Sequence, residues 1–233
     1  MDWLKVSEVF YSIQGEGVTT GVPAVFVRLT ACNLLCKSES WVCDTLEVWK
    51  RGKKTAFADI LCDDYLERLK EGAHLVVTGG EPLLQQERLV EYLHWLDIEI
   101  GGSLVVEVET NGTIVPIYPL VRRVKQWNVS PKLGNSGEHY DKRYVPLAIR
   151  ALCNTRRAWF KFVLTQRAEY EEILQDYAPM QDFDMERVIL MPAGETQAEL
   201  DVTRPAVIEL ARDQGHRYSD RLHIVAWNKK RRS

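Results

Sequence analysis

Residues 74–82 read His-Leu-Val-Val-Thr-Gly-Gly-Glu-Pro, an apolar run that ends in two glycines and a proline. Short runs of branched apolar residues are typical of β-strands buried in a sheet. The two glycines allow the backbone to approach a ligand closely, and Pro82 suits the first turn of a helix. This stretch therefore predicts a strand, a turn that can bind a ligand, and the start of a helix.

Similar apolar runs recur along the chain and alternate with segments of helical periodicity. Strands are predicted at residues 24–29, 74–78, 104–109, 126–130, 159–164, 187–191 and 222–225. Helices are predicted at residues 61–69, 89–96 and 170–177, and from Pro205, behind Thr203 as N-cap, to Gly215. This alternation predicts an α/β fold with a parallel sheet, which right-handed crossovers either close into a full or partial barrel or leave open. In both cases functional residues are expected at the carboxyl ends of the strands.

Length and composition fit one globular domain. The chain has 233 residues, of which 45% are hydrophobic and 27% charged, so disordered and collagen-like classes are excluded. There are 30 Lys and Arg residues against 33 Asp and Glu, and the net charge of −3 gives no support for a nucleic-acid-binding surface. No run reaches the ~18 apolar residues of a membrane span. The N-terminus lacks the basic start and apolar run of a secretory signal, so we expect a cytoplasmic protein.

Three of the five cysteines, Cys32, Cys36 and Cys43, follow the strand predicted at residues 24–29. In a reducing compartment such residues are thiols, metal ligands or catalytic groups more often than disulfide partners. Three thiolates can bind three irons of a 4Fe–4S cluster and leave the fourth iron open to another ligand. Structural zinc takes four ligands, usually in close pairs, and no suitably spaced fourth ligand follows. From spacing alone, a cluster, a zinc site and unused thiols all remain open. Cys62 is expected in the core, and Cys153 is expected to be structural.

The cysteine triple followed by Gly79-Gly80-Glu81-Pro82 resembles the radical S-adenosylmethionine enzymes. Further motifs, in family order, resemble the 7-carboxy-7-deazaguanine synthase family. They are Phe10-Tyr11-Ser12-Ile13-Gln14-Gly15-Glu16-Gly17, Arg28 in Phe-Val-Arg, Cys43-Asp44-Thr45, Glu109-Thr110-Asn111-Gly112-Thr113, Ser130-Pro131-Lys132, and Leu222-His223 with Trp227-Asn228-Lys229. One departure is the spacer of six residues between Cys36 and Cys43, where the family usually has two. Asp44-Thr45 nevertheless places Cys43 at the family's third cysteine.

The resemblance implies a single radical S-adenosylmethionine core domain over residues 1–233, folded as a partial or modified (β/α)6 TIM-like barrel, with residues 215–233 closing the active site. It implies conversion of 6-carboxy-5,6,7,8-tetrahydropterin to 7-carboxy-7-deazaguanine with loss of ammonia. The radical comes from the cofactor, so no side chain is assigned as catalytic. The implied cofactors are a 4Fe–4S cluster, S-adenosylmethionine and Mg²⁺. The implied partners are an electron donor such as flavodoxin or ferredoxin and a second copy of the chain in a homodimer.

The resemblance also assigns site residues by position. The cluster ligands are Cys32, Cys36 and Cys43, and Thr45 is the protein ligand to Mg²⁺. S-Adenosylmethionine is expected to contact Gly79, Gly80, Glu81, Glu109, Ser130, Pro131, Lys132, Thr165 and Gln166. The pterin is expected to contact Ile13, Gln14, Gly15, Glu16, Arg28, Thr78 and His223. Among these, the Arg28 guanidinium suits the substrate carboxylate.

Two alternative functions belong to other classes. A radical enzyme that activates a protein partner would lack the Gln-Gly-Glu-Gly start and the context of Arg28. A non-enzymatic iron–sulfur or zinc module would have no need of the methionine-binding turn at Gly79-Gly80-Glu81.

Overall fold

The computed structural model describes residues 2–39, 42–43, 45, 51–102 and 104–228. Its strands are β1 (Trp3–Ile13), β2 (Pro23–Leu29), β3 (Lys53–Ala56), β4 (His74–Gly79), β5 (Val106–Thr110), β6 (Gln126–Val129), β7 (Ala158–Leu164), β8 (Val188–Pro192) and β9 (Arg217–Tyr218). Within these described ranges they form one nine-stranded sheet in the order β3-β1-β2-β4-β5-β6-β7-β8-β9. β1 runs antiparallel to both β2 and β3. From β2 to β9 each neighbouring pair is parallel.

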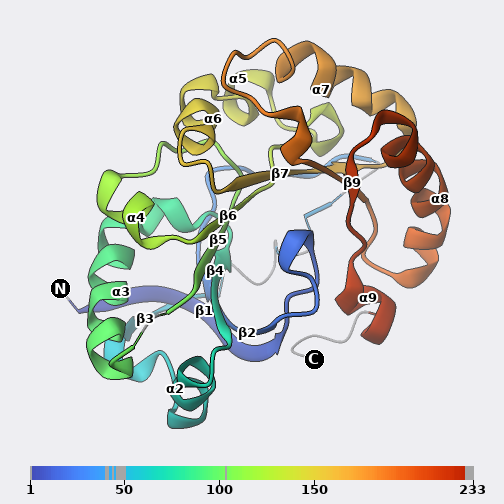
Figure 1. Ribbon diagram of the computed structural model, residues 1–233. Coiled ribbons are helices and arrows are strands. Elements are labelled where there is room, and N and C mark those ends of the chain that lie inside the picture. Colours follow the sequence, from blue (N-terminus) through green and yellow to red (C-terminus); the bar gives the residue numbers. More distant parts are fainter. Residues whose placement is uncertain (1, 40–41, 44, 46–50, 103, 229–233) are drawn as a thin grey trace.

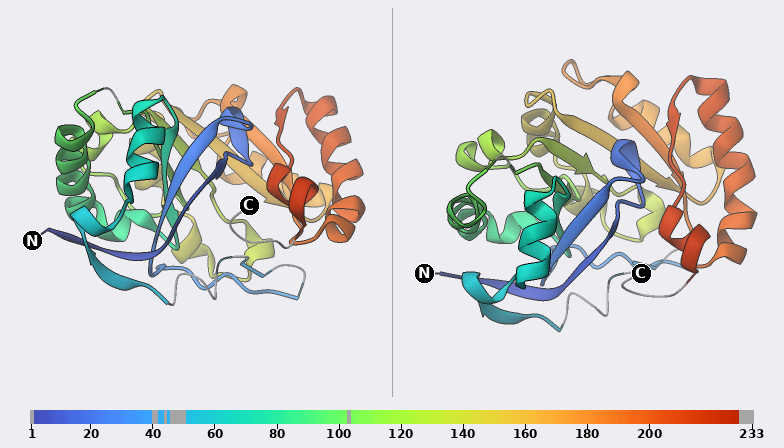
Figure 2. Two further views of the ribbon diagram at one scale, coloured as in Figure 1. Left: turned by 90° about the horizontal axis from the view of Figure 1, so that it is seen from below. Right: turned by 60° about the horizontal axis from the view of Figure 1, so that its bottom comes forward.

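Helices surround the outer side of the curved sheet, and the segment after β1 lies on its inner side (Figures 1 and 2). The α-helices are α2 (Asp63–Lys70), α3 (Gln86–Ile100), α4 (Tyr118–Arg123), α5 (Tyr140–Arg143), α6 (Pro146–Cys153), α7 (Tyr170–Asp176), α8 (Gln197–Gln214) and α9 (Leu222–Trp227). The 3₁₀-helices are η1 (Gly17–Thr19), η2 (Phe57–Asp59), η3 (Pro82–Gln85), η4 (Gly134–Ser136), η5 (Arg167–Glu169) and η6 (Met185–Arg187). In the described part of the chain, none of these helices is long and apolar enough to cross a membrane.

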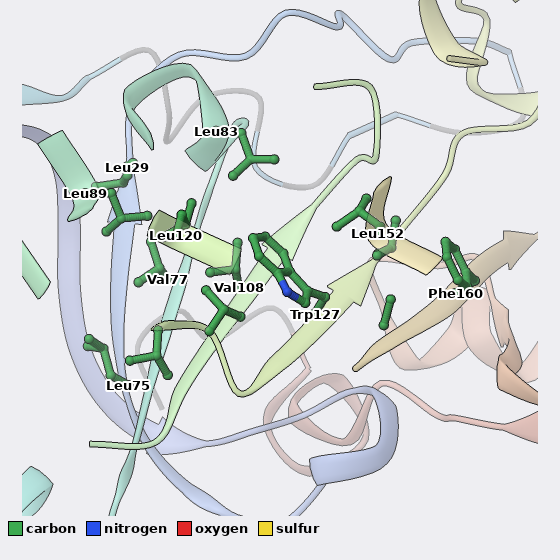
Figure 3. Close-up of a cluster of buried hydrophobic side chains, with 14 of the residues drawn as sticks. Leu29, Leu75, Val77, Leu83, Leu89, Val108, Leu120, Trp127, Leu152 and Phe160 are labelled. Atoms are coloured by element: carbon green, nitrogen blue, oxygen red, sulfur yellow. The ribbon is translucent and has the colours of Figure 1, made fainter. Parts of the chain in front are cut away.

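The hydrophobic core lies between the outer face of the sheet and the helices. Val77, Val108 and Trp127 of successive strands are fully buried and belong to one cluster with Leu89 of α3 and Leu120 of α4 (Figure 3). Burying each large apolar side chain contributes about 1.5–3 kcal/mol, so this layer stabilises the sheet strongly.

The inner face of the sheet carries several polar side chains beside a small apolar cluster that includes Phe26 and Val76. Successive side chains of a strand point to opposite faces, so the residues between the core positions point away from the helices. They include Arg28, Thr78, Glu109, Asn128 and Lys161. The alternation in these strands therefore separates a packed outer layer from an inner surface with polar groups that can line a site.

Six of the seven predicted strands are confirmed within two residues, and the segment predicted at 222–225 is wrong because it forms α9. A four-residue apolar run does not distinguish strand from helix by periodicity. α8 also begins earlier than predicted. Thr196 and Glu199 form a capping box at its start, and Pro205 lies inside it, while its end at Gly215 is confirmed.

The α/β prediction is confirmed, whereas a TIM-like barrel is not. The sheet is not closed, because β3 lies at one edge and β9 at the other. The sequence patterns missed β1 and β3, which extend the sheet by antiparallel pairing beyond β2.

Candidate active site

A cavity of about 380 Å³ opens on the inner side of the sheet. It is bounded by the loop after β1, the carboxyl ends of the parallel strands, the cysteine loop that carries Cys32, Cys36 and Cys43, and the C-terminal segment, of which residues 221–228 contribute to the lining. Sixteen of the predicted site residues line it: Ile13, Gln14, Gly15, Glu16, Arg28, Cys32, Cys36, Cys43, Thr45, Thr78, Gly79, Gly80, Glu109, Ser130, Lys132 and His223. Residues from opposite ends of the sequence thus share one cavity.

The three clustered cysteines lie at this cavity. Burial raises the pKa of Cys32 and raises that of Cys36 to about 12, against the opposing effect of Lys132. Among the described residues, which include every Cys and His, no three Cys, His, Asp or Glu side chains are placed to hold one metal ion. In a cluster each iron takes its own thiolate, so the thiols can stand farther apart. Three thiols at one cavity therefore fit a cluster in which each of them binds a different iron.

The other two cysteines lie outside the cavity. Cys62 is exposed at the N-cap of α2, so the prediction that it lies in the core is wrong. The N-cap residue precedes the first turn of the helix, so the helical period of the following residues does not place its side chain on the buried face. Cys153 ends α6, packed against the core.

Gly79 and Gly80 allow two strand ends to touch. A Cβ at Gly79, whose φ is +147°, would lie 2.2 Å from the Leu29 carbonyl oxygen. A Cβ at Gly80 would lie 2.0 Å from the Ala31 carbonyl oxygen and 2.8 Å from the Cys32 Cβ. Any larger residue would push the turn away from the cysteine loop. The glycine pair therefore sets the distance between the two loops.

Glu81 stabilises the Gly79-Gly80 turn from the protein interior. Its fully buried carboxylate accepts hydrogen bonds from Leu83 N–H at 2.9 Å, Thr110 Oγ1 at 2.8 Å and Asn111 N–H at 2.8 Å. Burial raises the pKa of Glu81, although these donors act in the opposite direction. Because its carboxylate is engaged within the protein, Glu81 does not line the cavity.

Glu109 connects the N-terminal loop to the sheet. One carboxylate oxygen accepts from Gln14 Nε2 at 3.2 Å and the other from Thr78 Oγ1 at 2.7 Å. All three side chains line the cavity. Glu109 therefore orients two polar groups at once.

Glu16 lies between two cations that the sequence patterns missed. Its carboxylate accepts from Lys161 Nζ and from Arg221 Nε, the latter at 3.0 Å. Burial alone would raise the pKa of Glu16, but Lys161 and Arg221 hold it well below its usual value. Burial would lower the pKa of Lys161, but Glu16 and Glu109 raise it. Both partners are therefore charged at neutral pH.

Arg28 also has a partner that the sequence patterns did not indicate. Its Nε donates to the Glu8 carboxylate at 2.9 Å, and both side chains line the cavity. Nearby, Phe10 and Phe26 stack with ring centroids 4.8 Å apart, giving the cavity an apolar wall.

Comparisons with known proteins show which family this chain resembles. A family of 4Fe–4S single cluster domains matches residues 13–114. The chain is 36% identical to the 7-carboxy-7-deazaguanine synthase of Halobacterium salinarum over 97% of this chain and 91% of the relative. It is 36% identical to that of Pyrobaculum aerophilum over 98% of this chain and 96% of the relative.

This chain belongs to the 7-carboxy-7-deazaguanine synthase family. The crystal structure of QueE from Escherichia coli is similar, with a TM-score of 0.68 and 25% sequence identity over 95% of each chain. The resemblance predicted from the motifs is confirmed. The protein is an enzyme, a radical S-adenosylmethionine lyase with an iron–sulfur cluster, and the two alternative functions are not favoured.

Four of the contacts predicted for this synthase do not line the cavity: Glu81, Pro131, Thr165 and Gln166. The Thr165 hydroxyl and N–H both donate to the Glu169 carboxylate. Lys132 Nζ donates to Ser130 Oγ at 2.9 Å, so these two cavity residues are oriented together. Thr45 Oγ1 lies 3.3 Å from Cys43 Sγ.

Of the two missed cations, Lys161 had a visible signal in the sequence. Lys161 interrupts the apolar run Phe160-Lys161-Phe162, and a charged residue between two buried ones points to the opposite face of a strand. The sequence Val106-Glu107-Val108-Glu109 carries the same alternation more clearly.

Proposed function

We propose that this protein converts 6-carboxy-5,6,7,8-tetrahydropterin to 7-carboxy-7-deazaguanine with loss of ammonia. Membership of the synthase family supports the reaction, and one observation of the structure carries it to this chain. A single cavity collects the three cysteines, the Gly79-Gly80 turn and Arg28. A cluster-binding group, a turn for the cofactor and a cation for the substrate carboxylate are therefore available at one place.

For the cluster, we propose Cys32, Cys36 and Cys43 as the only protein ligands. When bound, a reduced 4Fe–4S cluster with S-adenosylmethionine supplies the radical that takes hydrogen from an unactivated carbon. The protein's own task is to hold and orient both groups. Gly79 and Gly80 give close backbone approach beside Cys32, which supports their assignment to the methionine end.

The remaining cofactor contacts are proposed at neighbouring strand ends. Ser130 and Lys132 suit a carboxylate because they offer a hydroxyl and an ammonium group joined by a hydrogen bond. Glu109 lies near the carboxyl end of β5, at the same edge of the sheet, and its carboxylate suits a ribose hydroxyl. Pro131, Thr165 and Gln166 stay predicted contacts, and Glu81 is proposed to act through the turn that it stabilises.

For the substrate, Arg28 is proposed to bind the carboxylate, which a guanidinium recognises well. Ile13, Gln14 and Gly15 can present backbone and amide groups to the pterin edge, together with Thr78. Glu16 and His223 border the same space.

The C-terminal segment is proposed to close the site within a single domain. The Leu222 N–H donates to the Gly15 carbonyl at 2.9 Å, and the Gly17 N–H donates to Ser219 Oγ at 2.8 Å. These contacts support a wall that keeps water from the substrate. Of residues 215–233, those from 229 onward lie outside the described residues.

Mg²⁺, the electron donor and the homodimer also belong to the proposal. Thr45 is proposed as the protein ligand, since Mg²⁺ keeps several waters and takes few protein oxygens. Flavodoxin or ferredoxin is proposed as donor in a cytoplasmic setting.

The test is anaerobic incubation of the reconstituted protein with the carboxypterin, S-adenosylmethionine and a reductant, followed by mass analysis. Wild type and Cys153→Ala should form the deazaguanine product, and Cys32→Ala should form none. A wild-type protein with a full cluster and bound S-adenosylmethionine but no product would contradict the proposal.

A further inference from the structure

The cysteine spacer, residues 37–42, is anchored at both ends. Lys37 and Val42 pair as an antiparallel bridge. The Cys43 N–H donates to the Cys36 carbonyl at 3.1 Å. The two ends of the spacer therefore lie side by side, and the positions of Cys36 and Cys43 are linked although the spacer is longer than the family's.

A second loop, residues 134–138 after β6, packs against the spacer. Ser38 Oγ donates to the Asn135 carbonyl at 2.7 Å, and the Leu35 N–H donates to the Glu138 carboxylate. Gly137 lies so close that a Cβ there would be 2.4 Å from the Lys37 carbonyl oxygen. The loop 134–138 thus contacts the chain on both sides of Cys36.

The loop 134–138 is itself tied to the body of the protein. Asn135 Nδ2 donates to the Val163 carbonyl at 3.0 Å and to the Glu169 carboxylate at 2.7 Å. The Gly134 N–H donates to the Glu172 carboxylate at 2.8 Å. These bonds reach the end of β7, η5 and α7. Lys37 and Ser38, at the start of the spacer, therefore pack on a loop that is itself held in place, which their polar sequence did not indicate.

We propose that the loop 134–138 positions the long cysteine spacer for cluster binding, and that Gly137 permits the contact. The inference rests on the proposed function, because it takes Cys36 and Cys43 as cluster ligands. A chain with only two residues between these cysteines has no such segment to anchor. The same loop continues from Ser130 and Lys132, so one stretch of chain would position both the cysteine loop and the residues proposed for S-adenosylmethionine.

The test compares Gly137→Ala with Gly215→Ala. The two glycines have nearly the same left-handed backbone, with φ of +75° and +73°. A Cβ at Gly215 meets nothing within 4 Å, whereas one at Gly137 meets the Lys37 carbonyl. Both substitutions therefore introduce similar backbone strain, and only one disturbs the spacer. After anaerobic reconstitution, Gly137→Ala should lose most of its bound iron, and Gly215→Ala should keep the wild-type content.

A second variant tests the proposal independently of whether Gly137→Ala folds. Ser38→Ala combined with Glu138→Ala removes both side-chain anchors without backbone strain, and it should also bind less iron. Glu39→Ala, an exposed change within the same spacer, is its control and should keep full iron. Circular dichroism establishes that each variant is folded, and the electron paramagnetic resonance spectrum of the reduced cluster with S-adenosylmethionine should change in the two affected variants.

Equal iron content in Gly137→Ala and Gly215→Ala, both folded, would overturn the inference. Wild-type iron and an unchanged spectrum in the double variant would overturn it as well. Iron content is measured without turnover. A fully loaded wild type that makes no product would therefore contradict the proposed function alone.

Discussion

Glu16 and Lys161 form a buried ion pair between residues that lie 145 positions apart in the chain. Glu16 follows β1, and Lys161 lies on the inner face of β7. Arg221, just before α9, donates to the same carboxylate. One carboxylate thus joins the N-terminal loop, the sheet and the C-terminal segment around the cavity.

Breaking this pair should destabilise the protein strongly. Lys161→Met leaves the largely buried Glu16 carboxylate with Arg221 as its remaining charged hydrogen-bond partner among the described residues, and with His223 4.0 Å away. Losing one member of a buried pair costs about 3–5 kcal/mol, and less where a second partner remains. Urea unfolding at neutral pH measures the change in the free energy of unfolding.

Lys70→Met is the matched control. Lys70 pairs with Glu67 at 2.7 Å, but both side chains are largely exposed. Exposed pairs contribute about 0–1 kcal/mol, so this variant should unfold almost like wild type. Equal losses in the two variants would mean that the burial of the Lys161 pair adds nothing.

The pair should also impose a pH dependence on stability. The pKa of Glu16 is lowered from 4.5 in the folded protein, so its contribution is full above pH 4.5 and disappears as pH falls through the lowered pKa. The pKa of Lys161 is raised from 10.5, so its contribution is full below pH 10.5 and disappears as pH rises through the raised value.

Glu16→Gln reports the acidic side of this dependence. The difference in the free energy of unfolding between wild type and Glu16→Gln should be constant at neutral pH and shrink below pH 4.5. Urea titrations across acidic pH measure it. A difference that grows on acidification would show that the folded pKa is raised.

How much could be predicted from the sequence depends on how local the signal is. The turn at Gly79-Gly80 was predictable because a strand, two glycines and a proline are adjacent in the chain. The pairing of Glu16 with Lys161 was not, because it depends on which strand stands beside the N-terminal loop. The family motifs indicated most of the site residues. The alternation of apolar and charged residues in β5 and β7 indicated which charged side chains point to the inner face of the sheet.

Edges and ends of elements were the least predictable part of the fold. α9 was mistaken for a strand because four apolar residues fit both patterns. β9 has only two residues, Arg217 and Tyr218, and no periodicity can be recognised in so short a segment. Both elements help to hold the C-terminal segment, so the wall of the cavity was harder to predict than its base.

Arg28 should serve the substrate, and its pairing with Glu8 changes the expected result of removing it. Arg28→Ala leaves the Glu8 carboxylate without this partner at the cavity, where it would repel a substrate carboxylate. Losing a desolvated charge pair costs about 2–5 kcal/mol, so the KM for the carboxypterin should rise steeply while S-adenosylmethionine binding stays near wild type.

Glu8→Gln combined with Arg28→Ala separates the two effects. The double variant should recover part of the lost affinity for the pterin, because the repelling charge is gone. Steady-state kinetics for the pterin and equilibrium binding of S-adenosylmethionine are the measurements. Equal damage to both affinities in Arg28→Ala would assign Arg28 a structural role.

The last prediction concerns the contact between Gly15 and His223. A Cβ at Gly15 would lie 2.3 Å from His223 Nδ1 and 3.1 Å from its Cγ, and the Gly15 carbonyl accepts from Leu222 N–H. Gly15→Ala should therefore push the His223 ring aside and raise the KM for the pterin. Gly102→Ala is the control, because the nearest atom to its Cβ is 3.9 Å away. His223→Ala removes the clashing ring, so adding Gly15→Ala to His223→Ala should cost little further affinity, a non-additivity that a double-mutant cycle measures. Additive losses would show that Gly15 and His223 affect pterin binding independently.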